Sequence, residues 1–159
     1  LYPESERLKA LSQMDDYGWN VVHCAARSGN PELMRHILAL YPETERSRAV
    51  NVQDDQGWVV LHCVARSGFF EAIEIILNLY PEAERLQAMN RTSRDGDTVL
   101  HCVARSNKVE CIKAVLSLYP ESQRLQAVNR QNSFGNTVLK LMNEETRNKI
   151  TGWLSKSSK

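Results

Sequence analysis

A period of 39 residues constrains the fold of this chain more than any other feature. The tetrapeptide Leu-Tyr-Pro-Glu begins at four positions with this constant spacing, Leu1, Leu40, Leu79 and Leu118. A glycine, a His-Cys pair and an Arg-Ser pair recur with the same spacing in the segments between. A fixed period of roughly 20 to 50 residues is the signature of repeat architectures, in which each unit buries its apolar face against its neighbours. The chain is therefore expected to fold as a stack of similar units.

Residues 54–88 show what one unit contains. A polar turn that ends at Gly57 leads into apolar residues with helical spacing, and Gly68 then terminates this first helix. A second amphipathic helix follows and ends at Pro81, and the helix-prone residues after that proline predict a short third helix. Two helices joined by two or three residues pack antiparallel. The predicted fold class is therefore all-α, a solenoid of helix-turn-helix units with an extra short helix in each.

Charge and hydropathy argue against two classes of partner. The chain has 20 Lys and Arg residues against 19 Asp and Glu, so its net charge is only +1. Binding to nucleic acid or to an anionic membrane needs a concentrated basic field, which this balance argues against. No apolar run reaches the roughly 18 residues of a membrane span. The chain has no signal-peptide pattern and opens inside a repeat, which predicts a cytoplasmic location and excision from a longer protein.

Four cysteines raise the question of a disulfide. Cys24, Cys63 and Cys102 occupy one position in successive units. Packed helices lie about 8–10 Å apart, whereas a disulfide needs Cα atoms about 4.4–6.8 Å apart. These three cysteines are therefore expected to be reduced, buried and small apolar residues, and Cys111 on a second helix is expected to behave likewise.

Three histidines, His23, His62 and His101, precede those cysteines directly. Zinc needs four ligands about 2.0–2.3 Å from one ion, whereas neighbouring helical residues point in different directions and the next histidine is a unit away. The ring nitrogens are therefore expected to hydrogen-bond backbone or turn groups between units. No metal, cofactor or catalytic residue is predicted, since nothing supplies an orienting partner or an oxyanion hole for a cysteine nucleophile.

The segment 96–106 carries a resemblance to a known family. Its sequence, Gly-Asp-Thr-Val-Leu-His-Cys-Val-Ala-Arg-Ser, resembles the ankyrin repeat, with valine in place of the usual proline of the Thr-Pro-Leu-His tetrad. Asn107 stands where the family has glycine, a mild change because asparagine tolerates the left-handed region. The family's period is about 33 residues, and the surplus of about six here matches the Pro-Glu-x-x-Arg-x-x-Ala segment. Extended repeats of this kind are similar to those of ankyrin proteins that intracellular bacteria secrete into host cells.

The resemblance covers the whole chain and implies one ankyrin-repeat domain over residues 1–159. Residues 1–14 are expected to be the tail of a preceding unit, and complete units are expected to begin near Gly18, Gly57 and Gly96. Residues 135–159 are expected to form a C-terminal cap, with a shorter and more polar helix around residues 146–154 and a frayed tail beyond it.

An arginine recurs at the end of each first helix, as Arg27, Arg66 and Arg105. The resemblance places these residues on the concave surface that often contacts ligands, where they could bind an acidic or phosphorylated segment. The alternative, which we favour from the sequence, is that they complement the helix dipole and pair with turn carboxylates such as Asp16 and Asp55.

Positions that differ between units are better candidates for specificity, because the scaffold does not dictate them. Aromatic residues at such positions, Tyr17, Trp19, Trp58 and Phe134, are predicted to sit at turn tips as interface anchors. The alternative is that each ring folds back onto the neighbouring turn. The full predicted partner-binding set is Asp16, Tyr17, Trp19, Arg27, Asp55, Gln56, Trp58, Arg66, Arg94, Asp95, Asp97, Arg105 and Phe134.

A second set of arginines lies in the inserted segment. Arg7, Arg46, Arg85 and Arg124 each follow a glutamate by three residues, which predicts weak surface ion pairs, or otherwise a second binding face.

The function predicted from the sequence is a monomeric protein-interaction module that binds another protein, with a host protein as partner if the chain belongs to a secreted effector. The alternatives are a recruiting or regulatory domain of a longer enzyme, and a structural spacer without a dedicated partner.

Overall fold

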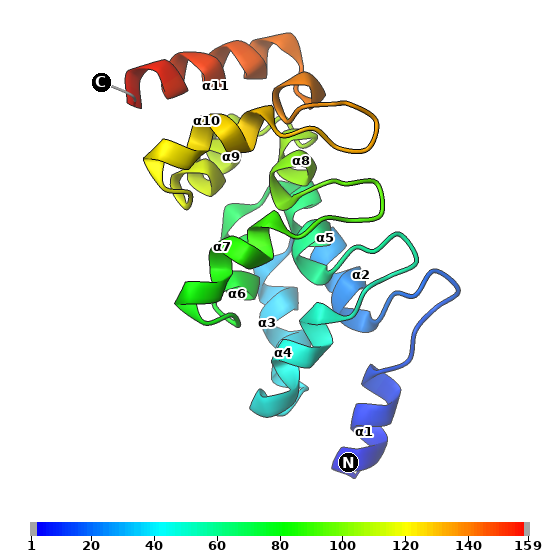
Figure 1. Ribbon diagram of the computed structural model, residues 1–159. Helices are drawn as coiled ribbons and strands as arrows, with labels where there is room; N and C mark the ends of the chain where they lie inside the picture. Colours follow the sequence, from blue (N-terminus) through cyan, green and yellow to red (C-terminus); the bar gives the residue numbers. More distant parts are fainter. Residues whose placement is uncertain (1–2, 158–159) are drawn as a thin grey trace.

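The computed structural model describes residues 3–157, and this part of the chain is a stack of helices with the two termini at opposite ends (Figure 1). The first helices of the units are α2 (Val21–Ser28), α5 (Val60–Ser67) and α8 (Val99–Ala104). The second helices are α3 (Pro31–Ala39), α6 (Phe70–Leu77) and α9 (Val109–Ser117). The inserted helices are α1 (Glu4–Leu11), α4 (Glu43–Asn51), α7 (Glu82–Asn90) and α10 (Glu121–Asn129). A 3-10 turn, η1 (Leu139–Leu141), and α11 (Glu144–Ser157) end the stack.

This arrangement confirms the all-α fold class. Within the described range, the structure has no strand beyond one isolated bridge between Gln131 and Thr137. Helices α2, α5 and α8 pack side by side, and α3, α6, α9 and α11 form a second layer against them. The core lies between these layers and includes Leu61, Ile73 and Leu100, each 0 or 1% exposed. None of the helices in residues 3–157 is long and apolar enough to cross a membrane.

The first helices form without the family's proline. The side-chain oxygen of Asn20 accepts hydrogen bonds from the backbone N–H groups of Val22 and His23, at 3.0 and 3.1 Å, and so caps α2. At the other end of this helix Gly29 has a left-handed backbone with φ 66°. Asn107 takes the same role after α8 with φ 53°, which confirms that asparagine replaces glycine there.

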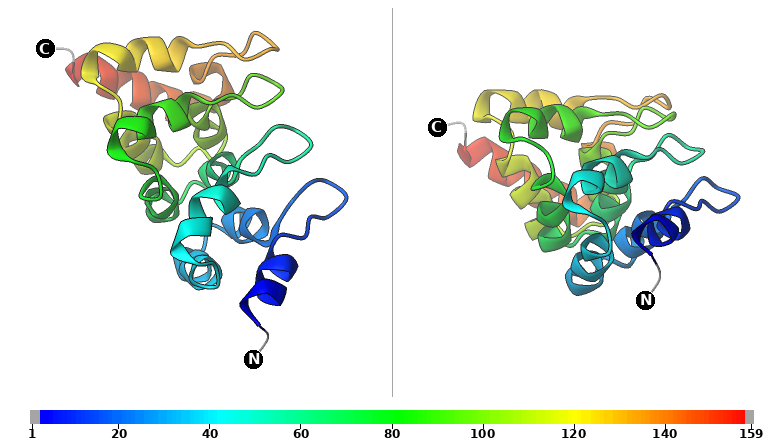
Figure 2. Two further views of the ribbon diagram at one scale, coloured as in Figure 1. Left: turned by 60° about the horizontal axis from the view of Figure 1, so that its bottom comes forward. Right: turned by 90° about the horizontal axis from the view of Figure 1, so that it is seen from below.

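Polar turns precede the first helices and project from the same side of the stack (Figures 1 and 2). Single backbone hydrogen bonds join each turn to the next: Asp55 N donates to Tyr17 O at 2.9 Å, Arg94 N to Gln56 O at 2.9 Å, and Ser133 N to Asp95 O at 2.8 Å. Gly57 is required at this crossing because its φ is 73° and an added Cβ would lie 3.0 Å from the backbone nitrogen of Arg94.

The arginines of the inserted helices do not form the ion pairs predicted from the sequence. Arg46 Nε donates to the carbonyl oxygens of Leu38 and Tyr41, at 3.0 and 3.3 Å, where α3 ends. Arg85 and Arg124 bond in the same way to the chain that precedes their own helices. Within residues 3–157, none of these arginines forms the predicted ion pair with the glutamate three residues before it. The reason is that the last carbonyl groups of a helix lack partners and carry the negative end of its dipole.

The end of the stack also differs from the sequence expectation. Helix α11 has 14 residues, so it is not a short helix over residues 146–154, and it continues to Ser157 instead of fraying from Ser155. Two contacts explain its length: Asn143 accepts a hydrogen bond from Thr146 N at 2.8 Å at the start, and the buried side chain of Ile150 anchors its middle. The rest of the predicted tail, 158–159, lies outside the described residues.

Candidate functional site

The candidate site is a groove of about 440 Å³ on the face formed by α2, α5 and the turns before them. We call it the Trp-Arg groove. It is lined by Trp19, Arg27, Trp58, Cys63, Arg66 and Ser67. Four of these six residues belong to the binding set predicted from the sequence, and the structure brings them together.

The two tryptophans form fixed walls of the groove. The indole Nε1 of Trp19 donates a hydrogen bond to Asp54 Oδ2 at 2.8 Å, so this ring folds back onto the neighbouring turn. The Trp19 ring stacks on His23 with 6.4 Å between ring centroids, and Trp58 lies tilted over His62 at 6.1 Å. Both tryptophans are half-buried and neither stands at a turn tip, so the alternative placement considered from the sequence is the correct one for Trp19.

The turn tips carry the other two predicted aromatics. Tyr17 is 72% exposed and Phe134 is 67% exposed, as expected for tip residues. The remaining polar members of the predicted set at the turns, apart from Asp97, are exposed or half-exposed: Asp16, Asp55, Gln56, Arg94 and Asp95.

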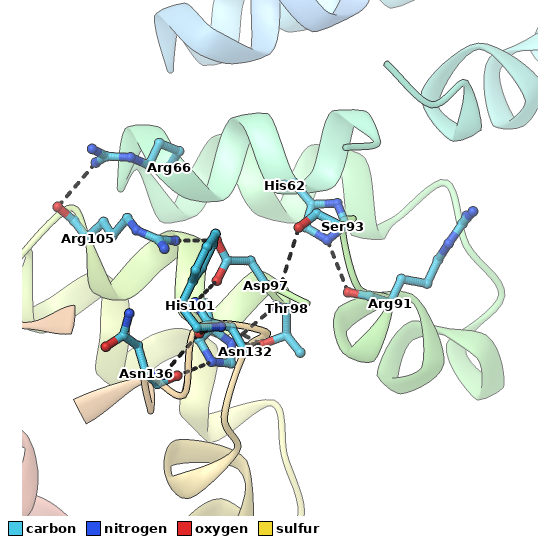
Figure 3. Close-up of polar contacts among 11 residues, drawn as sticks. His62, Arg66, Arg91, Ser93, Asp97, Thr98, His101, Arg105, Asn132 and Asn136 are labelled. Carbon is cyan, nitrogen blue, oxygen red and sulfur yellow. Dashed lines mark hydrogen bonds and ion pairs between the residues drawn. The ribbon is translucent and has the colours of Figure 1, made fainter. Parts of the chain in front are cut away.

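The three recurring arginines have three different environments. The guanidinium carbon of Arg27 lies 5.3 Å from the centre of the Trp19 ring. Arg66 Nη1 donates to the backbone oxygen of Arg105 at 3.2 Å, and Arg105 Nη1 lies 2.7 Å from Asp97 Oδ2 (Figure 3). Across the described range, neither Arg27 nor Arg66 forms an ion pair with a turn carboxylate. The pairing favoured from the sequence is therefore wrong for these two arginines.

Asp97 has to be removed from the candidate binding set. This residue is only 4% exposed, and the carboxylate oxygen that does not face Arg105 accepts a hydrogen bond from Asn132 Nδ2 at 2.8 Å (Figure 3). With Arg105 on one oxygen and Asn132 on the other, this side chain joins turns and helices inside the stack. Arg105 is held by the same contact and does not present a free guanidinium.

The histidines have the structural role predicted for them. In each unit Nδ1 accepts a hydrogen bond from the backbone N–H three residues earlier, at 3.3 Å for His23 and 3.2 Å for His62 and His101. Nε2 bonds to a backbone oxygen further along the stack, that of Trp58, Arg91 or Asn136 respectively, and Figure 3 shows the contacts of His62 and His101. In His62 and His101 an accepting Nδ1 leaves Nε2 as the donor, so the neutral ring satisfies both contacts. Burial lowers the pKa of all three imidazoles.

The cysteines are free thiols, and one of them differs from expectation. Cys63, Cys102 and Cys111 are buried, but Cys24 is exposed because in residues 3–157 no first helix precedes α2 to cover it. Burial raises the pKa of the Cys63 thiol to about 12 and that of Cys111 to about 11. These thiols stay protonated at neutral pH and are poor nucleophiles. The described residues also contain no group of three or more side chains that could hold a metal ion.

Sequence reasoning missed Asp54, which fixes both walls of the groove. Besides holding the Trp19 indole, this carboxylate accepts hydrogen bonds from the backbone N–H groups of Gln56 and Trp58, each at 2.8 Å. The signal was present in the repeat, since the equivalent positions carry turn-forming residues of the same kind: Asp15, Asp54, Ser93 and Asn132. Cys63 and Ser67 were also missed as groove residues, because recurring residues were assigned to the scaffold.

Comparison with known proteins agrees with this geometry. A family model described as ankyrin repeats, in three copies, matches residues 5–86, slightly more than half of the chain. The curated proteins include no match. The recurring first and second helices, the projecting turns and the histidines that join them are thus those of an ankyrin stack, and the chain belongs to the ankyrin repeat family.

Proposed function

We propose that this chain is a protein-interaction module and that its Trp-Arg groove contacts the partner. Ankyrin repeats are generally modules of this kind. The observation that carries the proposal is that one groove brings together two tryptophans and two arginines that form no ion pair with a carboxylate of residues 3–157. Tryptophan and arginine are enriched among the few interface residues that dominate binding free energy.

The walls of the groove are ordered before a partner binds. Trp19 is tethered to Asp54 and stacks on His23, and Trp58 lies tilted over His62; both histidines are themselves hydrogen-bonded into the core. A preordered aromatic wall loses little conformational entropy on association, which favours affinity. The exposed Tyr17 at the adjacent turn tip extends this surface outwards.

The test is affinity capture with the wild-type chain and with two variants, Trp19→Ala and Trp58→Ala. We expect each variant to lose the captured partner, with at least about tenfold weaker binding when the partner is then titrated, as for an interface anchor. Trp153→Ala is the matched control, because Trp153 is a half-buried tryptophan on α11 outside the groove.

Thermal unfolding of every variant, followed by circular dichroism, establishes that the fold is retained. Partners that bind both groove variants as tightly as the wild type would show that the groove is not the binding surface.

We further propose that the partner is a host protein, on the basis of the sequence resemblance to secreted bacterial ankyrin proteins. The capture is therefore run in parallel from a eukaryotic lysate and a bacterial lysate. Groove-dependent partners only in the bacterial lysate would contradict the effector role while leaving the groove assignment intact.

A further inference from the structure

We infer that the Trp-Arg groove binds an acidic linear segment of the partner, with an Asp or Glu carboxylate on Arg27 and Arg66 and an adjacent large apolar side chain against Trp19 and Trp58. This inference rests on the proposed function and specifies the chemistry of the segment that the groove accepts.

The first step of the argument is a pair of positions that recurs in each unit. Eight residues separate Trp19 from Arg27, Trp58 from Arg66, and Asp97 from Arg105. Long side chains on a helix point back towards its N-terminus, so the arginine near the end of each first helix extends along the helix towards the residue two positions before its start. The contacts confirm this for the first pair, a guanidinium over an indole ring, and for the third, an ion pair.

The third pair, Asp97 and Arg105, shows which group binds the arginine at this position when the chain itself provides one. Asp97 presents a carboxylate to Arg105, and the two atoms lie 2.7 Å apart with side-chain exposures of 26% for Arg105 and 5% for Asp97. Short, charge-assisted contacts of this kind are stronger than neutral hydrogen bonds. Asp97 therefore acts as an internal template for a carboxylate at this place in the unit.

In the first two units the chain supplies tryptophan instead of the carboxylate. Among residues 3–157, the contact found for Arg27 is the one with the Trp19 ring, and Arg66 makes one hydrogen bond, to the Arg105 carbonyl. A guanidinium has five N–H donors, so most of the donors on these two side chains face solvent. Both arginines are exposed, and they sit on the neighbouring helices α2 and α5.

Charge around the groove favours an acidic occupant. The nearest buried carboxylate, Asp54, is already occupied by the Trp19 indole and by its own turn. Asp16 and Asp55 are exposed, and within residues 3–157 neither forms an ion pair with these arginines, so the nearby aspartates reduce the positive potential of the groove without occupying its guanidinium donors. A basic segment would meet two guanidinium groups that have no carboxylate partner, whereas a carboxylate would meet their available donors.

The other residues that line the groove indicate the apolar part of the ligand. The indole faces of Trp19 and Trp58 and the protonated thiol of Cys63 give an uncharged wall beside the arginines. Indole rings bury large apolar area, so a Leu, Ile, Phe or Trp next to the acidic residue fits this wall.

The experiment uses the full chain as bait for a display library of random 12-residue peptides. We expect enrichment of Asp or Glu next to a large apolar residue. Affinities of the enriched peptides are then measured by fluorescence anisotropy. Arg27→Gln and Arg66→Gln are each expected to weaken binding at least about tenfold, as is replacement of the peptide's acid by its amide, because a charge-assisted contact is lost. Arg48→Gln is the matched control, since it removes the same charge from an arginine side chain that is 85% exposed on α4.

Three results distinguish failure of this inference from failure of the proposed function. Peptides that need Trp58 but not Arg27, Arg66 or an acidic residue overturn this inference and leave the proposed function standing. Peptides that bind Trp19→Ala and Trp58→Ala as well as the wild type, or no enriched peptide at all, overturn both. A phosphoserine peptide that binds more tightly than its Asp and Glu counterparts overturns the assignment to a carboxylate.

Discussion

Trp58 and Asp97 occupy equivalent positions 39 residues apart, and the difference between them sets the state of the arginine that follows each one. Arg105 forms an ion pair with Asp97 inside the chain, whereas Arg66 donates one hydrogen bond, to a backbone carbonyl. Under the proposed function, one residue per unit thus decides whether the chain itself occupies the face of that unit or leaves it open to a partner.

The Asp97 contacts are expected to contribute to stability. Asp97→Ala should lower the free energy of unfolding by about 1–3 kcal/mol, because two hydrogen bonds are lost and Asn132 and Arg105 lose their acceptor. Urea unfolding at pH 7 measures this change. Asp95→Ala is the control on the same turn: its side chain is only half-buried and we expect a change within about 0.5 kcal/mol. Equal effects of the two substitutions would contradict the role of Asp97.

The histidines predict a loss of stability in acid. Burial lowers the pKa of His23, His62 and His101 in the folded state below the usual value near 6.5. As pH falls below about 6.5, the unfolded chain therefore binds more protons than the folded chain, and unfolding becomes more favourable. The stabilisation is complete above that pH and is lost progressively below it.

Urea unfolding at pH 7.5 and pH 5.5 tests this dependence, with the lower midpoint expected at pH 5.5. His36→Gln should leave the difference between the two midpoints unchanged, because His36 is exposed on α3. NMR titration of the imidazole signals identifies the groups responsible. Buried histidines that titrate at or above pH 6.5 would contradict the mechanism.

At the scale of the elements, the sequence predicted the helices well because their boundaries depend on local chemistry. Turn glycines, the residues before the first helices and the prolines before the inserted helices each fix a start or an end within a few residues. The predicted ends of α11 and the predicted partners of the arginines on the inserted helices were wrong. Both depend on contacts beyond the helix itself: α11 is held by its packing against α9, and the arginines bond carbonyl groups five to eight residues earlier, where the preceding helix ends.

The capping role of these arginines predicts a stability difference within a single helix. Arg46→Ala should cost about 1–2 kcal/mol, because its guanidinium bonds two carbonyl oxygens where α3 ends. Arg48→Ala, on the same helix, should cost less than about 0.5 kcal/mol because that side chain is 85% exposed. Chemical denaturation of both variants provides the measurement, and indistinguishable midpoints would show that Arg46 is only a surface residue.

For the whole molecule, stability depends on each unit covering its neighbour, and α11 performs this function at the end of the stack. Its residue Ile150 is fully buried, and α11 packs against α9. Ile150→Ala should therefore destabilise the fold by about 2–5 kcal/mol, as for other large-to-small changes in a core. Thr151→Ala, at the exposed next position, serves as the control. If the two substitutions had the same small effect on urea unfolding, α11 would not be a structural cap.

The site was harder to predict than the fold, for a reason visible in particular residues. Periodicity separated recurring from variable positions, and the variable tryptophans did prove to line the groove. Periodicity does not reveal side-chain direction, so it placed Trp19 at a turn tip and Asp97 on the surface. It also assigned Cys63 to the scaffold alone, although this residue is both buried and part of the groove lining.

Backbone atoms and the histidines join the units, and so does the residue two positions before each first helix, which also lines the groove together with the arginine eight positions later. This position therefore serves stability and the proposed recognition together: Asp97 ties its unit to the next through Asn132, whereas tryptophan leaves the arginine of its unit without a carboxylate. A lineage that exchanged tryptophan and aspartate at this residue would change the length of the groove and the stability of the stack at the same time.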